Sequence, residues 1–403
     1  MSAQVTTATM SGKVTAQDEP IIGATIVAIH EPSGTRYGTV TNVSGQFNLQ
    51  GMRTGGPYKV EISYVGYQTA IYKGINLLLG ENYVLNVSLK ESSELLDEVV
   101  VTASKESNMK SDRAGAIMNA NRDMISNTPT ISRSISDIMR LSPQGADVGN
   151  GFAVGGGNYR QSFVTVDGAA FNNTFGLGGN LPANGSPISL DALEQVTVAV
   201  TPFDVRQSGF TGGAINAVTR SGDNQFRGTA YMYFNNENLK GSKVDDYELL
   251  RSKAQYYTYG ASFGGPIIKD KLFFFVNGEY EDNVTAGSNY RPRTALGESY
   301  SGGNIHRPLQ SDMDDMRGFL LNKYNFDPGK YNDYSTDTPA YRVMARVDWN
   351  ANQNNKVSFR FTKTHTKDSN FPTSSVSPLS TSALYPGGTS TEAVCYTHLT
   401  LPT

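Results

Sequence analysis

The chain has 403 residues, enough for two or three domains of roughly 100 to 200 residues each. Charged residues make up 18% and the formal net charge is -3, so the sequence lacks the basic field that attracts nucleic acid. The single cysteine, Cys395, excludes an internal disulfide framework and a multi-thiolate metal site. No apolar run approaches the roughly 18 to 20 residues of a membrane-spanning helix, so any membrane span must consist of strands.

The first segment, residues 1–91, consists of short alternating apolar runs separated by turn residues. Sequences such as Pro32-Ser33-Gly34 mark its turns, because glycine supplies a positive φ and proline presets the bend. This pattern predicts a small β-sandwich. We expect its strands at residues 21–29, 38–43, 46–49, 58–65 and 83–89.

The next segment, residues 92–110, combines an acidic joint with the apolar run Val99-Val100-Val101 and a polar stretch. Its valines favour an extended strand. From the residues alone, this strand is either the last strand of the sandwich or part of an ordinary linker. An extended segment with free backbone groups can also add to the edge of a partner's sheet.

Residues 111–224 mix short strands with glycine-rich loops. Apolar residues at helical spacing predict a helix over residues 134–141, and Asp167-Gly168 marks a tight turn. The glycine cluster at 149–157 lacks the strand-then-helix context of a phosphate-binding loop, which leaves ligand-touching loops or plain turns. Strands are expected at residues 161–166, 194–200 and 213–219.

From residue 225 to residue 392 the expected strands are longer and rich in aromatic residues. In one of them Arg342, Arg346 and Asp348 lie on one face, opposite Val343 and Trp349 on a face that could meet lipid. Short connections alternate with long ones, which favours an outer-membrane barrel over a soluble sandwich. The expected strands are residues 227–234, 256–264, 271–280, 342–349 and 356–364, and the long connections are residues 235–255 and 281–341.

Several stretches together resemble the TonB-dependent outer-membrane receptors, of the Oar-like and SusC-like type found in Bacteroidota. Residues 12–25, 44–47 and 64–67 look like the carboxypeptidase regulatory-like domain that precedes the plug in that group, and residues 264–275 resemble its early barrel. A further stretch is similar to the TonB box: Leu96, Asp97, Glu98, Val99, Val100, Val101, Thr102 and Ala103. The plug motif is matched at Asp167, Gly168, Glu194, Gly212, Gly213, Asn216, Thr219 and Gly222.

The resemblance implies a mainly β protein in three parts: a transthyretin-like sandwich over residues 1–91, an α+β plug over 111–224, and the start of a transmembrane β-barrel over 225–392. Residues 92–110 would be the linker that carries the TonB box. The family barrel has about 22 strands, so we expect an incomplete, N-terminal portion of a receptor, without its signal peptide. Residues 393–403 abandon the alternation and resemble a non-native tail.

The resemblance further implies import of a large nutrient, such as a peptide, glycan or chelate, across the bacterial outer membrane. Expected partners are TonB on the periplasmic side, where the sandwich and plug would lie, outer-membrane lipid, an extracellular ligand and a surface lipoprotein. Neither a cofactor nor a metal is expected, and no catalytic residues, since no HExxH or GxSxG motif occurs. Glu194, Arg206 and Arg220 are candidates for charged contacts between plug and barrel. The alternative function is a surface adhesion or carbohydrate-binding β-sandwich protein.

Overall fold

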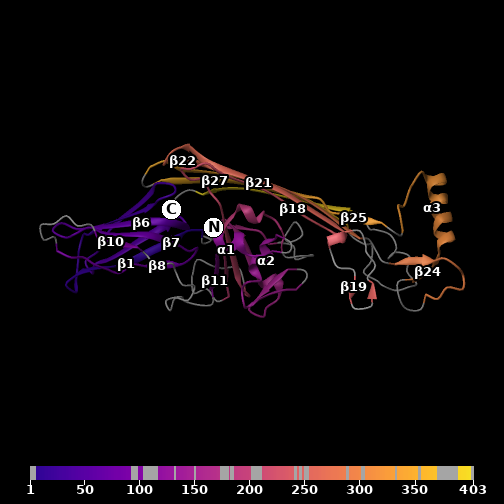
Figure 1. Cartoon of the computed structure of the whole chain (residues 1–403), viewed down its shortest axis with the longest axis horizontal. Helices are drawn as coiled ribbons and strands as arrows, with labels where there is room; N and C mark the ends of the chain where they lie inside the picture. Colours follow the sequence, from indigo (N-terminus) through magenta and orange to yellow (C-terminus); the bar gives the residue numbers. More distant parts are fainter. Residues whose placement is uncertain are drawn as a thin grey trace.

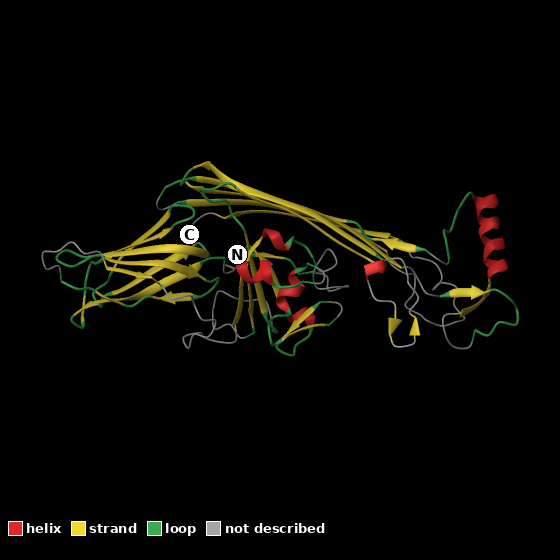
Figure 2. Ribbon diagram, viewed as in Figure 1, coloured by secondary structure: helices red, strands yellow, loops and turns green. Residues whose placement is uncertain are grey.

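The computed structural model describes most of the chain and divides it into three parts (Figures 1 and 2). We name them the sandwich (6–102), the plug (117–224) and the wall (226–400), after the parts that the sequence predicts. The described residues are 6–91, 99–102, 117–130, 133–148, 151–172, 181, 186–200, 211–239, 243–244, 247–248, 254–286, 290–300, 305–331, 334–352, 355–369 and 389–400.

The sandwich packs two sheets face to face. In the first, β1 (Ala8–Ala16) pairs with β2 (Glu19–Pro20), β5 (Gln46–Met52), β8 (Asn82–Val84) and β9 (Val87–Ser88). The second has the order β10 (Val99–Thr102), β7 (Ala70–Leu77), β6 (Gly55–Ser63), β3 (Thr25–His30) and β4 (Thr35–Val40). The side chains that fill the space between the sheets include Met10, Val14, Ile26, Phe47, Tyr58 and Ile62. The sequence predicted this sandwich but not the strands β1 and β7.

The plug is a five-stranded sheet with short helices on it. The sheet order is β11 (Ile117–Asn121), β16 (Leu193–Ala199), β17 (Ala214–Thr219), β14 (Phe163–Val166) and β15 (Ala169–Ala170). The predicted helix is α2 (Ile135–Met139), where Ser134 and Asp137 form a capping box and Ile135, Ile138 and Met139 enter the core. The other elements are α1 (Arg122–Asn127), β12 (Gly145–Asp147), β13 (Phe152–Val154), η1 (Tyr159–Gln161) and η3 (Leu190–Ala192).

The wall is an antiparallel sheet of long strands that runs over the plug (Figure 1). Its order is β18 (Arg227–Asn236), β21 (Gln255–Ile268), β22 (Leu272–Ala286), β26 (Ala340–Asn350), β27 (Lys356–Ser369) and β28 (Thr389–Thr400), with β25 (Ser335–Asp337) beside β22. None of the helices in the described part of the chain is long and apolar enough to cross a membrane. The long connections carry η4 (Glu237–Leu239), β19 (Lys243–Val244), β20 (Tyr247–Glu248), β23 (Arg291–Arg293), β24 (Ile305–Leu309) and α3 (Gln310–Tyr324).

The last strand of the wall lies where the sequence pattern predicts none. β28 includes most of the expected tail from residue 393 and pairs with β27 along twelve residues, from Ser369 opposite Thr389 to Ser358 opposite Thr400. Backbone groups make these pairs, so an open strand edge can order a segment whose side chains do not alternate.

The two faces of the wall differ as the alternation predicts. On β26, Val343 and Trp349 are exposed, whereas Arg342, Arg346 and Asp348 are buried on the face toward the plug. Aromatic side chains continue the exposed face on neighbouring strands. The wall therefore carries its polar groups inside and an apolar surface outside, as a lipid-facing strand requires. Exposed apolar residues of this face include Met232, Phe234, Tyr259, Phe263, Val276, Tyr280 and Phe359.

One end of the sandwich holds a buried polar chain that reaches the wall. His30 Nδ1 lies 2.7 Å from Ser33 Oγ, and Ser33 Oγ lies 2.8 Å from Thr35 Oγ1. Asn350, at the end of β26, donates from Nδ2 to Thr35 Oγ1 at 3.0 Å. Burial, followed by the charge of Arg53, lowers the pKa of His30 to about 3.

We predict that the stability of the sandwich falls as the pH drops from about 6.5 toward 3. The pKa of His30 is lower in the folded state than in the unfolded chain, so protons bind preferentially to the unfolded chain across this window. Between pH 7 and pH 5 the loss should be about 2 kcal/mol in the free energy of unfolding. Urea unfolding of residues 1–91 at both pH values measures it. His30→Asn keeps a polar partner for Ser33 but cannot titrate, and an equal loss in that variant would contradict the assignment.

Candidate functional site

The plug presents a buried carboxylate to the wall at the turn between β14 and β15. Asp167 and Gly168 form this turn with φ values of 52° and 83°, a backbone that suits glycine and that aspartate tolerates. Asp167 Oδ1 accepts the backbone N–H of Thr219 at 3.0 Å, and Oδ2 accepts the Thr219 hydroxyl at 2.6 Å. Two residues of the predicted plug motif are thus joined across neighbouring strands.

Two arginines of the wall face this carboxylate. Arg360 Nε lies 3.3 Å from Asp167 Oδ2, and Arg346 Nη1 lies 4.0 Å from Oδ1. Arg346 also donates from Nη1 to the carbonyl oxygen of Thr219 at 2.6 Å, and its Nε lies 2.8 Å from Asp348 Oδ2. All five residues are at most 9% exposed, so these charges interact in a medium of low polarity. We call Asp167, Thr219, Arg346, Asp348 and Arg360 the Asp167 cluster.

The sandwich also reaches this cluster. Arg53 Nη2 lies 3.7 Å from Asp348 Oδ2 and 3.4 Å from the carbonyl oxygen of Gly222. Ser221, just after the last plug strand, donates its hydroxyl to Asp348. Asp348 therefore receives groups from the sandwich, the plug and the wall at one point.

A second contact between plug and wall centres on Arg220. Its Nη1 donates to the carbonyl oxygen of Asp191 at 3.1 Å and to Ser262 Oγ of β21 at 3.3 Å. The guanidinium carbon lies 4.6 Å from the centre of the Phe275 ring, a cation–π contact with β22. Burial, followed by the charge of Arg122, lowers the pKa of Arg220 to about 10, so the side chain remains charged at neutral pH.

A third contact centres on Glu279 of β22. Glu279 Oε2 accepts the hydroxyl of Ser189 in the plug at 2.8 Å and that of Tyr231 in the wall at 2.6 Å. Arg342 Nη1 lies 3.0 Å from Glu279 Oε1, and Arg342 Nε donates to the carbonyl oxygen of Ser186 in the plug. Wall side chains thus hold the plug segment that leads into η3.

Other residues of the plug motif serve close packing. A Cβ atom at Gly222 would lie 2.3 Å from the carbonyl oxygen of Phe274, and one at Gly213 would lie 2.5 Å from Val154 Cγ1. At Gly212 the nearest atom would be Gln161 Cβ, at 3.3 Å. Asn216 accepts the hydroxyl of Thr165 at 2.7 Å between two buried strands. The three glycines allow close approach of neighbouring atoms, and Asn216 links β17 to β14.

Gln195 of the plug sheet bonds to the backbone of the sandwich. Gln195 Oε1 accepts the backbone N–H of Leu79 at 2.8 Å, and Gln195 Nε2 donates to the carbonyl oxygen of Leu77 at 3.1 Å. Leu79 also packs on Val218. These two amide hydrogen bonds and the small apolar contact add to the bonds from Arg53 to Gly222 and from Asn119 to Glu81 between sandwich and plug.

The other predicted site residues have separate positions. Within the TonB-box-like segment, Val99–Thr102 form β10 on the edge of the sandwich, whereas Leu96, Asp97, Glu98 and Ala103 lie outside the described residues. Glu194 faces Arg122 of the plug, with Oε2 and Nη1 4.0 Å apart. Arg206 lies outside the described residues.

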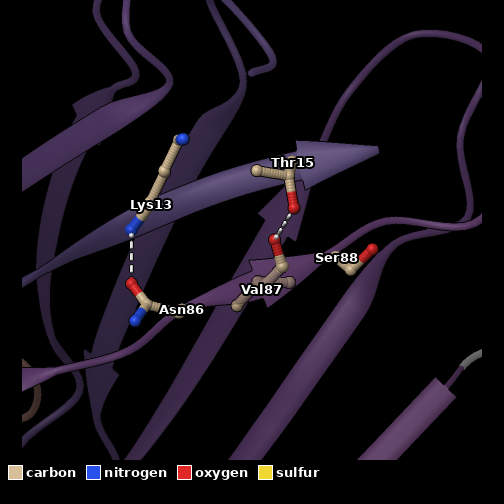
Figure 3. A pocket seen from close by; sticks show the side chains of 5 residues that line it. All are labelled: Lys13, Thr15, Asn86, Val87 and Ser88. Carbon is tan, nitrogen blue, oxygen red and sulfur yellow. Dashed lines mark hydrogen bonds between the residues drawn. The ribbon is translucent and has the colours of Figure 1, made fainter. Parts of the chain in front are cut away.

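A shallow hollow on the sandwich offers less. Lys13, Thr15, Asn86, Val87 and Ser88 line it where β1 lies beside β9 and the residue before β9 (Figure 3). Its polar groups bond to one another: Lys13 N donates to Asn86 Oδ1 at 3.0 Å, and Thr15 Oγ1 to the carbonyl oxygen of Val87 at 3.5 Å. Across the described residues, no group of three or more His, Cys, Asp or Glu side chains could hold a metal ion.

Sequence reasoning missed several of the residues that make these contacts. Arg53, Ser189, Gln195 and Glu279 carry no local motif, and their partners are far away in the sequence. A usable signal existed only for the wall, where charged residues at every second position of an aromatic-rich strand indicate a polar face. Of the three charged candidates, Arg220 contacts the wall.

Comparison with known proteins fits this arrangement. The family model of the carboxypeptidase regulatory-like domain matches residues 9–90, and that of an outer membrane beta barrel domain matches residues 218–403. The TonB-dependent transporter Oar of Myxococcus xanthus is 27% identical over 256 residues, which cover 62% of this chain and 22% of Oar. This chain is homologous to the TonB-dependent outer-membrane receptors. The homology also assigns the chain to the bacterial outer membrane.

A second relative is the TonB-dependent receptor SusC of Bacteroides thetaiotaomicron. It is 29% identical over 269 residues, which cover 63% of this chain and 24% of SusC. The chain thus spans about a quarter or less of these two relatives. Among solved structures, the siderophore receptor PirA of Acinetobacter baumannii gives a TM-score of 0.48 at 16% identity, covering 71% of this chain and 37% of PirA.

We predict that Asp167→Asn destabilises the plug within the wall. The change removes the buried negative charge that faces Arg346 and Arg360, and breaking such a buried pair typically costs about 3 to 5 kcal/mol. The thermal unfolding of the receptor in detergent, with limited proteolysis of the plug, measures this. Asp123→Asn removes an exposed carboxylate from the plug as a control. Equal stability of the two variants would rule out a holding role for Asp167.

We also predict that Gly222→Ala disrupts the passage from plug to wall. Its new Cβ would meet backbone oxygens of Phe274 and Gly265 at 2.3 and 2.8 Å, and backbone atoms of a sheet cannot move aside cheaply. Gly278→Ala in β22 is the matched control, because nothing lies within 4 Å of its added Cβ. The melting temperature should fall clearly for the first variant and little for the second. A tolerated alanine at both positions would contradict the close approach.

Proposed function

We propose that this receptor imports a large nutrient, a peptide, glycan or chelate, across the outer membrane with energy delivered through TonB. The observation that carries the proposal is the set of buried polar contacts between plug and wall, centred on Asp167, Arg220 and Glu279. A plug that must move during transport needs contacts that can break and re-form. No residue named in this mechanism does chemistry on the nutrient.

The packing between plug and wall favours such movement. The plug has its own apolar core, to which the described wall residues contribute Phe275 and Met344. The rest of the named contact consists of hydrogen bonds and ion pairs. Displacement of the plug therefore exposes little apolar surface to water. Water can replace the hydrogen bonds and ion pairs that break, which keeps the net cost in free energy small.

Energy would enter at the segment of residues 96–103, which resembles the TonB box. Its described part, Val99–Thr102, is extended and pairs through its backbone. An extended segment of this kind can add to the edge of a partner's sheet, where main-chain hydrogen bonds supply affinity. We place this segment, the sandwich and the plug on the periplasmic side.

The opposite end of the molecule is suited to the nutrient. In Figure 1, α3 and β24 lie at the end far from the sandwich, in the long connection between β22 and β26. Phe319, Tyr324 and Phe326 there are each more than half exposed. Exposed aromatic faces bind both peptides and sugars, which supports these ligand classes. We also expect a surface lipoprotein to cover this end.

We predict that Val100→Pro abolishes coupling to TonB without preventing assembly in the outer membrane. Proline lacks the backbone N–H and resists the ladder of a sheet, so strand addition fails at this point. Val100→Thr is the matched control, because threonine keeps the N–H and a β-branched side chain. Pull-down of the receptor by the periplasmic C-terminal domain of TonB measures the effect. If the proline variant is captured as well as the threonine variant, the segment is not the coupling site.

A further inference from the structure

The TonB-box-like strand occupies the edge of the larger sandwich sheet. β10 pairs in parallel with β7, with Val99 opposite Ala70 and Thr102 opposite Lys73. In the sheet order β10-β7-β6-β3-β4 it is the terminal strand. One side of its backbone therefore faces β7, and among the described residues no strand pairs with the other side. Figure 1 shows β10 within the sandwich, on the side of the molecule away from α3.

The opposite edge of the same sheet lies against the wall. Thr35, at the start of β4, accepts a hydrogen bond from Asn350 of β26, and Lys356 of β27 places its Nζ 3.2 Å from the centre of the Tyr37 ring. A strand arriving from the periplasm would meet the wall at this edge. Among the described residues, no strand pairs with the outer side of β10, and a strand edge with unpaired backbone groups is a template for another strand.

The chain before β10 is anchored beside the strand that β10 joins. Tyr67 and Glu91 form an antiparallel bridge, and Gln68 donates its backbone N–H to the carbonyl oxygen of Lys90 at 2.9 Å. Ala70, the partner of Val99, lies three residues beyond Tyr67. The first two contacts hold Glu91, and the pairing with Ala70 holds Val99, near the start of β7.

We propose that TonB adds its strand to the outer edge of β10 while β10 stays on β7, so that the sandwich sheet forms part of the TonB docking surface. This rests on the proposed function, since it assumes that residues 96–103 are the coupling segment. β7 orders the four residues Val99–Thr102 before the partner arrives. Ordering a segment in advance removes part of the conformational entropy that binding would otherwise cost. The sandwich thereby acts as a platform for the partner rather than as a spacer.

A reversible cross-link between β7 and β10 tests this proposal. Lys73→Cys and Thr102→Cys, in a Cys395→Ser background, place thiols on aligned residues of neighbouring strands. Such strands lie about 4.8 Å apart, within the Cα separations that a disulfide spans. Binding of the TonB C-terminal domain to the receptor in detergent is measured before and after reduction, with each single-cysteine variant as a control.

We expect the disulfide to form and the cross-linked receptor to bind TonB at least as tightly as the reduced one. A loss of about tenfold or more that reduction restores would overturn the proposal, because β10 must then leave the sandwich to meet TonB. Failure of the two cysteines to cross-link would overturn it as well. Hydrogen exchange of the receptor without cysteine changes gives a second readout: amides of Ala70–Lys73 should remain protected when TonB binds, and their exposure would contradict the proposal.

A synthetic peptide of residues 96–103 separates this proposal from the function on which it rests. If the peptide binds TonB but the cross-linked receptor does not, the coupling segment stands and the platform fails. If neither the peptide nor the reduced receptor binds TonB, residues 96–103 are not a coupling segment, and both proposals fail.

Discussion

The position of the plug depends on one buried carboxylate, that of Asp167. Arg346 and Arg360 project from the wall into a region that little water reaches, and a buried guanidinium without an anion is costly. Asp167 supplies that anion, and its own turn is fixed by Thr219. Because Arg346 also pairs with Asp348, and Asp348 with Arg53, a change at this one point reaches all three parts of the chain.

The wall reverses the usual arrangement of a soluble protein. Its outer face carries aromatic and aliphatic side chains, whereas Arg342, Arg346 and Asp348 face a second folded unit. The plug can meet such a surface only with polar groups of its own, and it does so with Asp167, Ser189 and Arg220. The plug core is closed mainly by its own residues, which separates the stability of the plug from its attachment.

Patterns within single segments predicted much of this fold. The alternation along β26 assigned Arg342, Arg346 and Asp348 to one face, and the Asp167-Gly168 turn was readable from residue type alone. The strands β1 and β7 were missed, since their sequences hold small and polar residues whose burial depends on strands elsewhere. β28 was missed because backbone pairing with β27 orders it without alternating side chains.

Partners far apart in the sequence were out of reach. Nothing near Arg53 indicates that it meets Asp348, and nothing near Gln195 indicates that its amide bonds to Leu77 and Leu79. For residues 99–102 the valines predict a strand but leave its neighbour open, and only the sheet order shows it beside β7. The sequence therefore predicts which segments are extended but not which distant segments they contact.

The charged inner face of the wall has a consequence for the permeability of the membrane. Arg342, Arg346, Arg360 and Glu279 are hydrophilic groups that water can solvate as soon as the plug withdraws from them. The surface left behind would be wetted rather than collapse, as in the water-filled lumen of a porin. We therefore expect a closed wall of this kind, deprived of its plug, to leak small polar solutes across the outer membrane.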